Sequence, residues 1–493
     1  MNLKDPGLFR TQAYVDGAWV DADDGTTRPV SDPATGLVIA EVANCAKVET
    51  KRAIEAAERA QVEWRRVPAK EKSRLIRNLF DLMMTHQEDL GTIMTLEQGK
   101  PLAEAQGEIA YGAAFLEWFA EEAKRVYGDT IPGPTGDRRI VVVKEPVGVV
   151  ACITPWNFPN AMLTRKIGPA LATGCTVVCK PANATPLSAL AIGELSARAG
   201  IPPGVINILA GNTAEIGAEM TSNPIVRKLT FTGSTEVGKT LIQQCAATVK
   251  RTSMELGGNA PFIVFDDADV DAAVNGAIAS KYRNAGQTCV CANRMLIQAG
   301  VYETFAERLA ERVSKLKVGN GMEPGIEIGP LIDDTAADDV IGLIEEATAT
   351  GAQVLTGGGR LALGERFVAP TVLTEVTDEM RVFNEEIFGP VAPLIKFDTE
   401  SEAIELANKT EFGLASYFYA RDVGRIWRVA EGLEYGIVGI NEGVISNEMA
   451  PFGGMKASGN GREGSKYGVD EYLEIKYLCM GGIQSLSAGA SVS

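Results

Sequence analysis

Short apolar runs alternate with longer segments of helical period over residues 147–265. The first run, "VGVVACIT" (147–154), has the length and β-branched content of a buried strand, and the helical segment "AMLTRKIGPALATG" (161–174) follows it. This repeated order predicts an α/β fold in which helices cover both faces of a parallel sheet. The series continues with "CTVVCK" (175–180), "PLSALAIGELSARAG" (186–200), "GVINILA" (204–210), "NTAEIGAEMTS" (212–222), "VRKLTFTG" (226–233), "STEVGKTLIQQCAAT" (234–248) and "VKRTSMEL" (249–256). Ligands of such a sheet bind at the carboxyl ends of its strands, so functional residues are expected there.

A second alternating series extends from about residue 259 to 440 and predicts another α/β unit. Residues 1–128 differ, because a β-rich start leads into long helical segments at 49–64 and 70–102. Since 493 residues exceed what one hydrophobic core normally organises, two large domains are expected. The members of the second series are "APFIVF" (260–265), "VDAAVNGAIASKY" (270–282), "RMLIQ" (294–298), "YETFAERLAERVSKL" (302–316), "SEAIELANKT" (401–410) and "YGIVGIN" (435–441).

Two further segments have the pattern of strands with half of their residues polar: "RRIVVVKEP" (138–146) and "YLEIKYLCMG" (472–481). Exposed strands of this kind invite pairing with another chain, so a homo-oligomer, a dimer or a tetramer, is expected. The last residues, "GGIQSLSAGASVS" (481–493), are small and polar, which predicts a frayed tail.

The charge balance narrows the classes of partner. With 47 basic and 64 acidic residues the net charge is −17, which disfavours nucleic acid and anionic membranes. The chain contains no apolar stretch of the roughly 20 residues that a bilayer span needs, and "MNLKDPGLFR" (1–10) lacks the pattern of a secretory signal. Its eight cysteines are scattered, which suits a reducing compartment, so the cytoplasm is expected.

The chain has a single histidine, His86, which limits the classes of catalytic and metal site that it can form. A Ser-His-Asp triad or a His-rich zinc site would have to use it, and it lies within a helical stretch that favours an ordinary structural role. Acid–base work is therefore expected to fall to carboxylates or cysteine, and no metal site is expected.

Two glycine-containing segments are candidates for a phosphate-binding turn. "GNGREG" (459–464) matches G-x-G-x-x-G but follows no predicted strand, so it lacks the context of a dinucleotide fingerprint. "LTFTGSTEVGKT" (229–240) has that context, because an apolar strand leads through Gly233 into an amphipathic helix. The first amides of that helix could bind a pyrophosphate, and Ser234 is its expected N-cap. Such a junction is also common as plain structure.

"KYRNAGQTCVCANR" (281–294) places Cys289 and Cys291 one residue apart. Half of a zinc site would need two more ligands, and the chain offers only "CTVVC" (175–179), which reads as a buried strand. A disulfide between residues this close is strained. Two buried thiols, or a nucleophile in a loop formed by Gly286 and Gln287, remain open.

Several motifs occur together and in one order: "TPWNFP" (154–159), "FTGSTEVG" (231–238), "MELGGNAP" (254–261), "NAGQTC" (284–289), "NEEIFGPV" (384–391) and "PFGGMKASGNGREGSKYG" (451–468). This set resembles the NAD(P)-dependent aldehyde dehydrogenase superfamily, and the resemblance extends over almost the whole chain. It implies a Rossmann-type cofactor-binding domain (1–128 and 148–258), a second α/β catalytic domain (259–471), and oligomerisation strands with a tail (129–147 and 472–493).

The resemblance assigns the catalytic roles. Cys289 is implied as the nucleophile that converts an aldehyde into a thiohemiacetal and then a thioester. The amide of Asn157 and the backbone N–H of Cys289 are implied as the oxyanion donors. Glu255 is implied as the base for hydrolysis, with a pKa raised by partial burial. Relatives that pass the acyl group to coenzyme A commonly lack this glutamate, so a free acid is the expected product.

Cofactor contacts are implied in the same way. Lys180 is expected at the adenosine ribose, Ser234 at the pyrophosphate, and Glu386 with Phe388 at the nicotinamide ribose. NAD-preferring relatives often carry glutamate three residues after the lysine, where this chain has Asn183. A 2′-phosphate therefore meets no like charge, which predicts NADP, with NAD as the other cofactor of the family. The full set expected to contact the cofactor is Thr154, Pro155, Trp156, Lys180, Ala182, Asn183, Gly233, Ser234, Gly257, Glu386 and Phe388.

Three residues bear on the substrate. Arg165, Arg283 and Ser446 match the residues that bind the distal carboxylate in the succinate-semialdehyde dehydrogenase subfamily. Two guanidinium groups and a hydroxyl suit a carboxylate. Oxidation of succinate semialdehyde to succinate is therefore expected, with glutarate semialdehyde as the nearest rival, because one methylene discriminates weakly.

Cys291 is expected to pack in the interior, with a reversible link to a low-pKa Cys289 thiolate as the alternative. Two functions from other classes are weaker. A non-catalytic relative would not need Cys289, Glu255 and Asn157 together, and a thiol hydrolase or acyltransferase would not need the nucleotide motifs.

Overall fold

A computed structural model describes residues 2–483 of the chain. Its largest sheet has the strand order β19-β11-β10-β7-β8-β9-β1-β2. The five strands from β11 to β9 pair in parallel, and β19, β1 and β2 add antiparallel edges. The bounds are β1 Ala13–Val15, β2 Ala18–Val20, β7 Val149–Ile153, β8 Thr176–Lys180, β9 Ile206–Ile208, β10 Val226–Thr232, β11 Arg251–Glu255 and β19 Gly459–Asn460.

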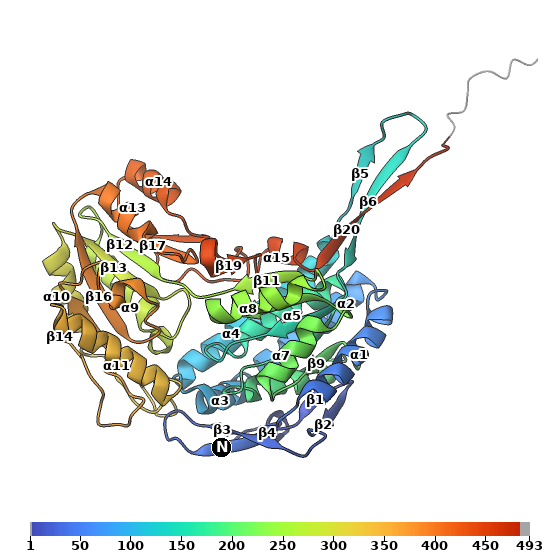
Figure 1. Cartoon of the computed structure of the whole chain (residues 1–493), viewed down its shortest axis with the longest axis horizontal. Helices are drawn as coiled ribbons and strands as arrows, with labels where there is room; N and C mark the ends of the chain where they lie inside the picture. Colours follow the sequence, from blue (N-terminus) through green and yellow to red (C-terminus); the bar gives the residue numbers. More distant parts are fainter. Residues whose placement is uncertain (1, 484–493) are drawn as a thin grey trace, which may run out of the picture.

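Helices cover this sheet on both faces, as the alternating pattern predicts, so the expected α/β class is confirmed (Figure 1). Connecting helices follow β7, β8, β9 and β10 in turn, and helices from the N-terminal region pack beside them. The bounds are α1 Lys47–Trp64, α2 Ala69–Thr85, α3 Gln87–Gln98, α4 Leu102–Glu122, α5 Ala161–Thr173, α6 Leu187–Arg198, α7 Thr213–Ser222 and α8 Thr235–Ala246. Each strand and helix expected over residues 147–256 is present, although β9 is only three residues long.

The helical stretch expected at 70–102 is divided in the structure. α2 ends and α3 begins at His86, whose φ of −104° and ψ of 18° depart from the helical region. Both helices pack against α4 and α6, and α2 in addition packs against α5. Periodicity alone cannot reveal such a turn, because both helices keep an apolar face.

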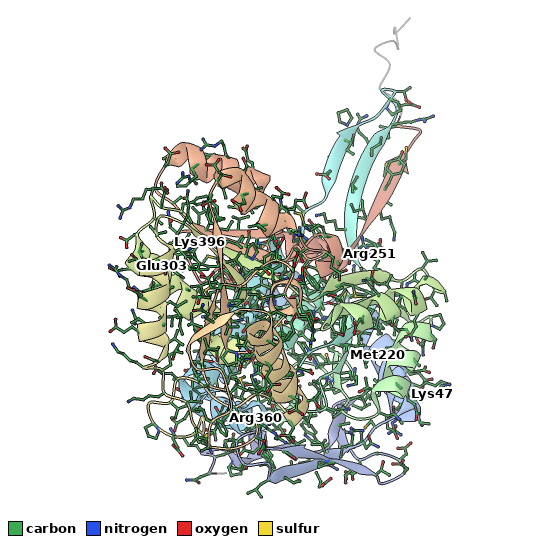
Figure 2. The ribbon with its side chains drawn as sticks, turned by 60° about the vertical axis from the view of Figure 1, so that its left-hand side comes forward. Lys47, Met220, Arg251, Glu303, Arg360 and Lys396 are labelled. Carbon is green, nitrogen blue, oxygen red and sulfur yellow. The ribbon has the colours of Figure 1, made fainter. Side chains whose placement is uncertain are left out.

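The second sheet has the order β14-β15-β16-β13-β12-β17-β18, with only β14 antiparallel. Its strands are β12 Ala260–Val264, β13 Ala292–Gln298, β14 Gln353–Thr356, β15 Thr371–Thr374, β16 Val391–Phe397, β17 Ala415–Tyr419 and β18 Ile437–Ile440. Its helices are α9 Val270–Lys281, α10 Tyr302–Val313, α11 Asp334–Ala349, α12 Arg381–Asn384, α13 Glu400–Asn408 and α14 Val423–Gly432. Figure 2 shows Glu303 of α10 near Lys396 of β16 at the outer surface, where their charged groups lie 3.3 Å apart.

The two large sheets have separate hydrophobic cores. One core extends from Ala260 to Phe452 and surrounds the second sheet. The cores beside the first sheet draw on residues 8–256 and on Val469, Tyr472 and Leu473 near the end of the chain. The domain boundaries inferred from the sequence stay a prediction. Among the described residues, every helix is too short or too polar to cross a membrane.

A third, smaller sheet projects from the body of the molecule (Figure 1). It consists of β5 (Asp129–Pro132), β6 (Arg139–Pro146) and β20 (Leu473–Met480), all antiparallel. β20 is an edge strand and exposes Ile475, Tyr477, Leu478 and Met480. Both expected strands are therefore present, and they pair with each other. Of the expected tail, residues 484–493 lie outside the described residues. A separate hairpin of β3 (Thr27–Ser31) and β4 (Val38–Ala43), the short helix α15 (Tyr467–Asp470), and the 3-10 turns η1 (Pro6–Leu8), η2 (Ala123–Arg125), η3 (Arg283–Gly286) and η4 (Lys456–Ser458) complete the fold.

Candidate active site

The part of the molecule built on the first sheet is called the first lobe, and the part built on the second sheet the second lobe. A cavity of about 270 Å3 lies between them, at the carboxyl ends of β7, β10 and β11. It contains nine of the residues expected from the sequence, together with Met162, Thr232 and Leu256. Those nine are Pro155, Trp156, Asn157, Gly233, Ser234, Gly257, Cys289, Glu386 and Phe388. The parallel topology explains why the residues after β7, β10 and β11 converge, because loops after neighbouring strands emerge at the same edge of a sheet. Cys289, Glu386 and Phe388 come instead from segments that precede strands of the second sheet.

Gly233 and Ser234 join β10 to α8 as the sequence predicts. Ser234 is the N-cap of α8 and its side-chain oxygen accepts a hydrogen bond of 3.4 Å from the Val237 amide. A Cβ at Gly233 would lie 2.4 Å from the Phe231 ring, so this turn has no room for a side chain. Because Gly233 and Ser234 line the cavity, the start of α8 lies beside it, and the start of a helix suits an anion.

Glu386 approaches the cavity from the second lobe. Its carboxylate accepts a 3.1 Å hydrogen bond from the Gly258 amide, and burial raises its pKa to about 7. A Cβ at Gly257 would lie 2.9 Å from that carboxylate, which explains the glycine there. Phe388, held at a φ of 50°, meets Trp156 edge to face at 5.6 Å. These residues form one wall of the cavity.

A strained turn places Cys289. Asn284 and Ala285 both adopt left-handed φ values, 52° and 55°, which few non-glycine residues do. Asn284 is held from the first lobe, since its amide donates to Glu104 (2.9 Å) and its side chain accepts from Gln98 (3.0 Å). Such strain persists only when surrounding contacts over-determine it, and it is typical of functional turns.

Burial raises the pKa of the Cys289 thiol to about 12, and the carboxylates of Glu386 and Glu255 act in the same direction, against Arg165 and Arg283. This direction is opposite to that of the low-pKa Cys289 thiolate expected from the sequence. The surrounding apolar walls favour the neutral thiol, and nearby cationic groups do not overcome them.

Glu255 is the last residue of β11 and is buried. Its pKa is raised well above the ordinary value, first by burial and then by the neighbouring Glu463, while Arg165 and Lys166 oppose the shift. One carboxylate oxygen, Oε2, has no hydrogen-bond partner among residues 2–483. A buried carboxylate with a free oxygen is what a general base beside a cavity requires.

Asn157 lines the cavity and links the two lobes by hydrogen bonds. Its side-chain amide donates to the Gln287 carbonyl at 3.0 Å, two residues before Cys289. Its own carbonyl accepts from Lys100 (2.8 Å) and from the Asn284 side chain (3.0 Å). The amide is thus fixed beside the cysteine, with its second N–H available to an oxyanion.

Lys180 lies outside the cavity at the end of the adjacent strand β8. It is buried, which lowers its pKa to about 8, and its ammonium donates to the Pro181 carbonyl (3.0 Å) and to Asn183 (3.4 Å). The Lys180 carbonyl accepts from the Thr154 amide, and Ala182 begins the turn that follows. The four expected cofactor residues Thr154, Lys180, Ala182 and Asn183 therefore form one group beside the cavity. No carboxylate contributes to the pKa shift of Lys180.

The three expected substrate residues also lie outside the cavity lining. Arg165 is fully buried, with Nε 2.7 Å from Glu463. Arg283 lies over the Phe158 ring at 5.4 Å, and its Nε has no hydrogen-bond partner within residues 2–483. Arg165 and Ser446 are brought together through the hydroxyl of Tyr111, with no direct contact between them.

Sequence reasoning missed Tyr111, Glu463, Lys166, Lys100 and Glu104. Lys166 and Glu463 form a buried ion pair of 2.5 Å behind Glu255. The signal for it was a lysine within the mostly apolar helical segment 161–174, but its partner is 297 residues away along the chain.

Cys291 is buried, and its thiol contacts the Lys281 carbonyl at 3.4 Å and the Ala292 carbonyl at 3.5 Å. All eight cysteines, which lie within the described residues, are free. Between residues 2 and 483, no three His, Cys, Asp or Glu side chains form a group that could hold a metal ion.

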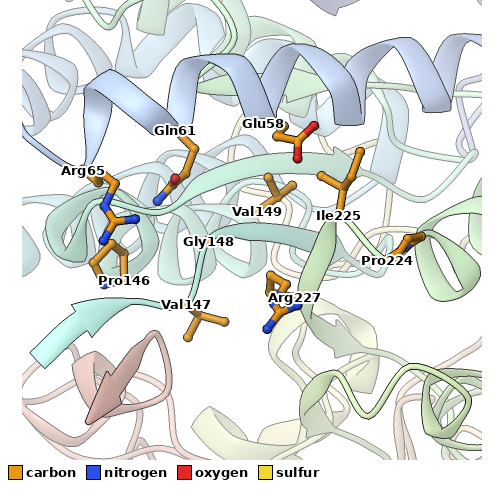
Figure 3. A pocket seen from close by; sticks show the side chains of 10 residues that line it. All are labelled: Glu58, Gln61, Arg65, Pro146, Val147, Gly148, Val149, Pro224, Ile225 and Arg227. Atoms are coloured by element: carbon orange, nitrogen blue, oxygen red, sulfur yellow. The ribbon is translucent and has the colours of Figure 1, made fainter. Parts of the chain in front are cut away.

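A larger cavity of about 370 Å3 lies at the opposite, amino end of β7, beneath α1 (Figure 3). Glu58, Arg65 and Arg227 are among its lining residues, whereas none of the expected site residues is. Ligands of a parallel sheet bind at the carboxyl ends of its strands, so this cavity at the amino end is separate from the candidate active site.

Comparison with known proteins places this site in a family. The model of the aldehyde dehydrogenase family matches residues 19–478, and the chain therefore belongs to that family of oxidoreductases. It is 62% identical to glutarate-semialdehyde dehydrogenase of Pseudomonas aeruginosa, over 98% of this chain and 100% of the relative. It is 59% identical to succinate-semialdehyde dehydrogenase (NADP+) of Escherichia coli, again over 98% and 100%. A crystal structure of an E. coli NADP-dependent enzyme superposes with a TM-score of 0.97 at 59% identity, covering 97% of this chain and 100% of that chain.

The raised thiol pKa predicts how Cys289 reacts in the protein without its ligands. In a Cys479→Ser background, which removes the exposed cysteine, the rate of Cys289 alkylation by iodoacetamide should rise continuously up to pH 10, because the thiolate fraction grows until the pKa of about 12. Peptide mapping identifies the labelled residue, and Cys289→Ser is the control. A plateau already reached at neutral pH would contradict the raised pKa.

Proposed function

We propose that this protein oxidises succinate semialdehyde to succinate with NADP+ as the hydride acceptor. The observation that carries the proposal is the surroundings of Cys289: a fixed amide at Asn157, and the charged groups of Glu255, Arg165 and Arg283, which are near enough to affect the pKa of its thiol. In such an arrangement the aldehyde group of the substrate meets Cys289 and Asn157, and its distal carboxylate meets the arginines. The curated relatives that the chain resembles include enzymes named for acid aldehydes of this kind.

The first chemical step uses Cys289 and Asn157. The thiol sulfur adds to the aldehyde carbon while its proton passes to a base, and the carbonyl oxygen becomes an oxyanion. The Asn157 side-chain amide and the Cys289 backbone amide are the donors proposed for that oxyanion, and each such donor contributes about 3–4 kcal/mol in comparable sites. Glu255 and Glu386, both with raised pKa values, are the nearby carboxylates able to take the proton.

The second step uses Glu255. Loss of hydride from the thiohemiacetal leaves a thioester on Cys289, which water must cleave. Glu255 removes a proton from that water, and the thiol leaves as the acid forms. Because its pKa is raised, this step slows as the pH falls, since a protonated Glu255 cannot act as a base.

The cofactor fits the residues present. We assign Ser234 and the start of α8 to the pyrophosphate, Lys180 to the adenosine ribose and its 2′-phosphate, and Glu386 to the nicotinamide ribose. Two features support this fit. Gly233 and Gly257 leave the cavity open because they have no side chain, and the helix start offers free backbone amides. When bound, NADP+ supplies the hydride acceptor.

Glutarate semialdehyde is the second candidate substrate, because the chain is 62% identical to a relative named for it. A panel of ω-carboxylate aldehydes of three to six carbons, with the uncharged aldehydes of the same lengths, tests both. The highest kcat/KM should fall on the four-carbon acid aldehyde. A maximum at five carbons would select the second candidate, and equal values for charged and uncharged aldehydes would remove both.

The assembly and the compartment are also proposed. Exposed Ile475, Tyr477 and Leu478 on the edge strand β20 support a homo-oligomer, dimer or tetramer, built through this strand. The eight free cysteines support the cytoplasm as the compartment. A reversible link between Cys289 and Cys291 is retained as a proposal, although the Cys291 thiol is directed at backbone carbonyls.

Arg283→Ala tests the carboxylate-binding role. It should reduce kcat/KM for succinate semialdehyde by about ten- to hundredfold, the value of one charge-assisted hydrogen bond, and change that for butanal little. Arg421→Ala, at an exposed arginine, is the matched control. Equal losses on both aldehydes would show that Arg283 supports the fold of the turn instead of binding the carboxylate.

Asn183→Glu tests the basis of cofactor choice. The new carboxylate beside Lys180 should lower kcat/KM for NADP+ by at least about tenfold through like-charge repulsion with the 2′-phosphate, while NAD+ is spared. Asn183→Gln, which adds length without charge, should keep the preference of the parent. Wild-type protein that already prefers NAD+ would contradict the assignment.

A further inference from the structure

The hydroxyl of Tyr111 lies between two of the residues assigned to the substrate. Tyr111 belongs to α4, and its hydroxyl is 2.7 Å from the Ser446 hydroxyl. The same oxygen accepts a hydrogen bond of 3.3 Å from Nη1 of Arg165 in α5. The phenol of Tyr111 thereby joins Arg165 to Ser446, which lies 335 positions after Tyr111, and the pattern of the sequence contains nothing that links them.

The guanidinium group of Arg165 is held by an ion pair and by aromatic packing, but its Nε and Nη2 have no hydrogen-bond partner among residues 2–483. Its Nε faces Glu463 at 2.7 Å, and the group lies over the Phe452 ring at 4.0 Å. Nη2 is fully buried and has no hydrogen-bond partner among residues 2–483. An arginine fixed in this way, with an unsatisfied N–H pair next to a phenol, is prepared for an anion, because leaving such a donor unpaired is costly.

Tyr111 also packs next to a residue that lines the cavity of Cys289, although Tyr111 is not itself part of the lining. Its ring packs against the small apolar cluster of Phe158, Ala161 and Met162. Met162 lines the cavity with Cys289, and Phe158 carries the guanidinium group of Arg283 over its ring. The hydroxyl of Tyr111 therefore lies where the groups assigned to the substrate's far end converge.

We infer that Tyr111 is a further substrate-binding residue whose hydroxyl hydrogen-bonds the distal carboxylate of the aldehyde. This inference rests on the proposed function. Because the phenol oxygen accepts from Arg165, its own proton is free to be donated, either to Ser446 or to a ligand. When a carboxylate arrives, the phenol can donate to it and still accept from Arg165, so one hydroxyl both orients the arginine and contacts the substrate.

Tyr111→Phe tests this, since it removes only the oxygen and keeps the ring that packs on Phe158 and Met162. The measurement is the ratio of kcat/KM for succinate semialdehyde to kcat/KM for butanal, taken on the same preparation. This ratio does not depend on how much of the protein is active, so a partly misfolded variant still gives a valid result. Tyr127→Phe, at an exposed tyrosine, is the matched control.

The ratio should fall about ten- to hundredfold in Tyr111→Phe, the effect of losing one hydrogen bond to a charged group, and remain unchanged in Tyr127→Phe. An unchanged ratio would overturn the role of Tyr111. This holds whether the substitution lowers kcat/KM equally for both aldehydes or for neither. A wild-type ratio near one would instead show that the proposed substrate is wrong. The two failures are thus distinguishable.

Discussion

The hydrogen bonds that join the two lobes beside Cys289 are the interaction on which the site depends. Asn157, from the loop after β7, donates to Gln287 and accepts from Asn284 across the junction. Gln98 and Glu104 add two more bonds to the same turn. Without them the left-handed conformations of Asn284 and Ala285 would relax, because each such residue costs of order 1–3 kcal/mol. The turn that carries Cys289 therefore belongs to one lobe and is held by hydrogen bonds from the other.

Burial sets the electrostatics of the same place. It raises the pKa values of the Cys289 thiol and of the Glu255 and Glu386 carboxyl groups together. Arg165 and Lys166 limit the effect on Glu255 while they neutralise Glu463. The two cations therefore lie between two carboxylates of opposite pKa shift, that of Glu255 being raised and that of Glu463 lowered.

The sequence was informative where local patterns determine structure. The strand, glycine and helix around Gly233 and Ser234 could be read directly, because the turn, the N-cap and the helix are contiguous. The alternating runs gave the parallel sheet for the same reason. The turn at His86 was missed, since a break between two amphipathic helices leaves their periodicity intact.

Contacts between distant segments could not be predicted. The Lys166–Glu463 pair and the Tyr111 hydroxyl join residues hundreds of positions apart. The family motifs identified Cys289, Glu255 and Asn157, but they did not show that Arg165 shares its guanidinium group between Glu463 and Tyr111. The raised pKa of Cys289 likewise follows from the packed walls of the cavity, which no single motif encodes.

The central claim is that the acyl group resides on the sulfur of Cys289 before water releases it. Mixing Glu255→Gln with succinate semialdehyde and NADP+, followed by acid quenching and tryptic mass mapping, measures this directly. The account predicts a succinyl adduct on peptide 284–294, assigned by fragmentation to Cys289 and absent in Cys289→Ser. Formation of NADPH with no adduct, or with the adduct on Cys291, would contradict it.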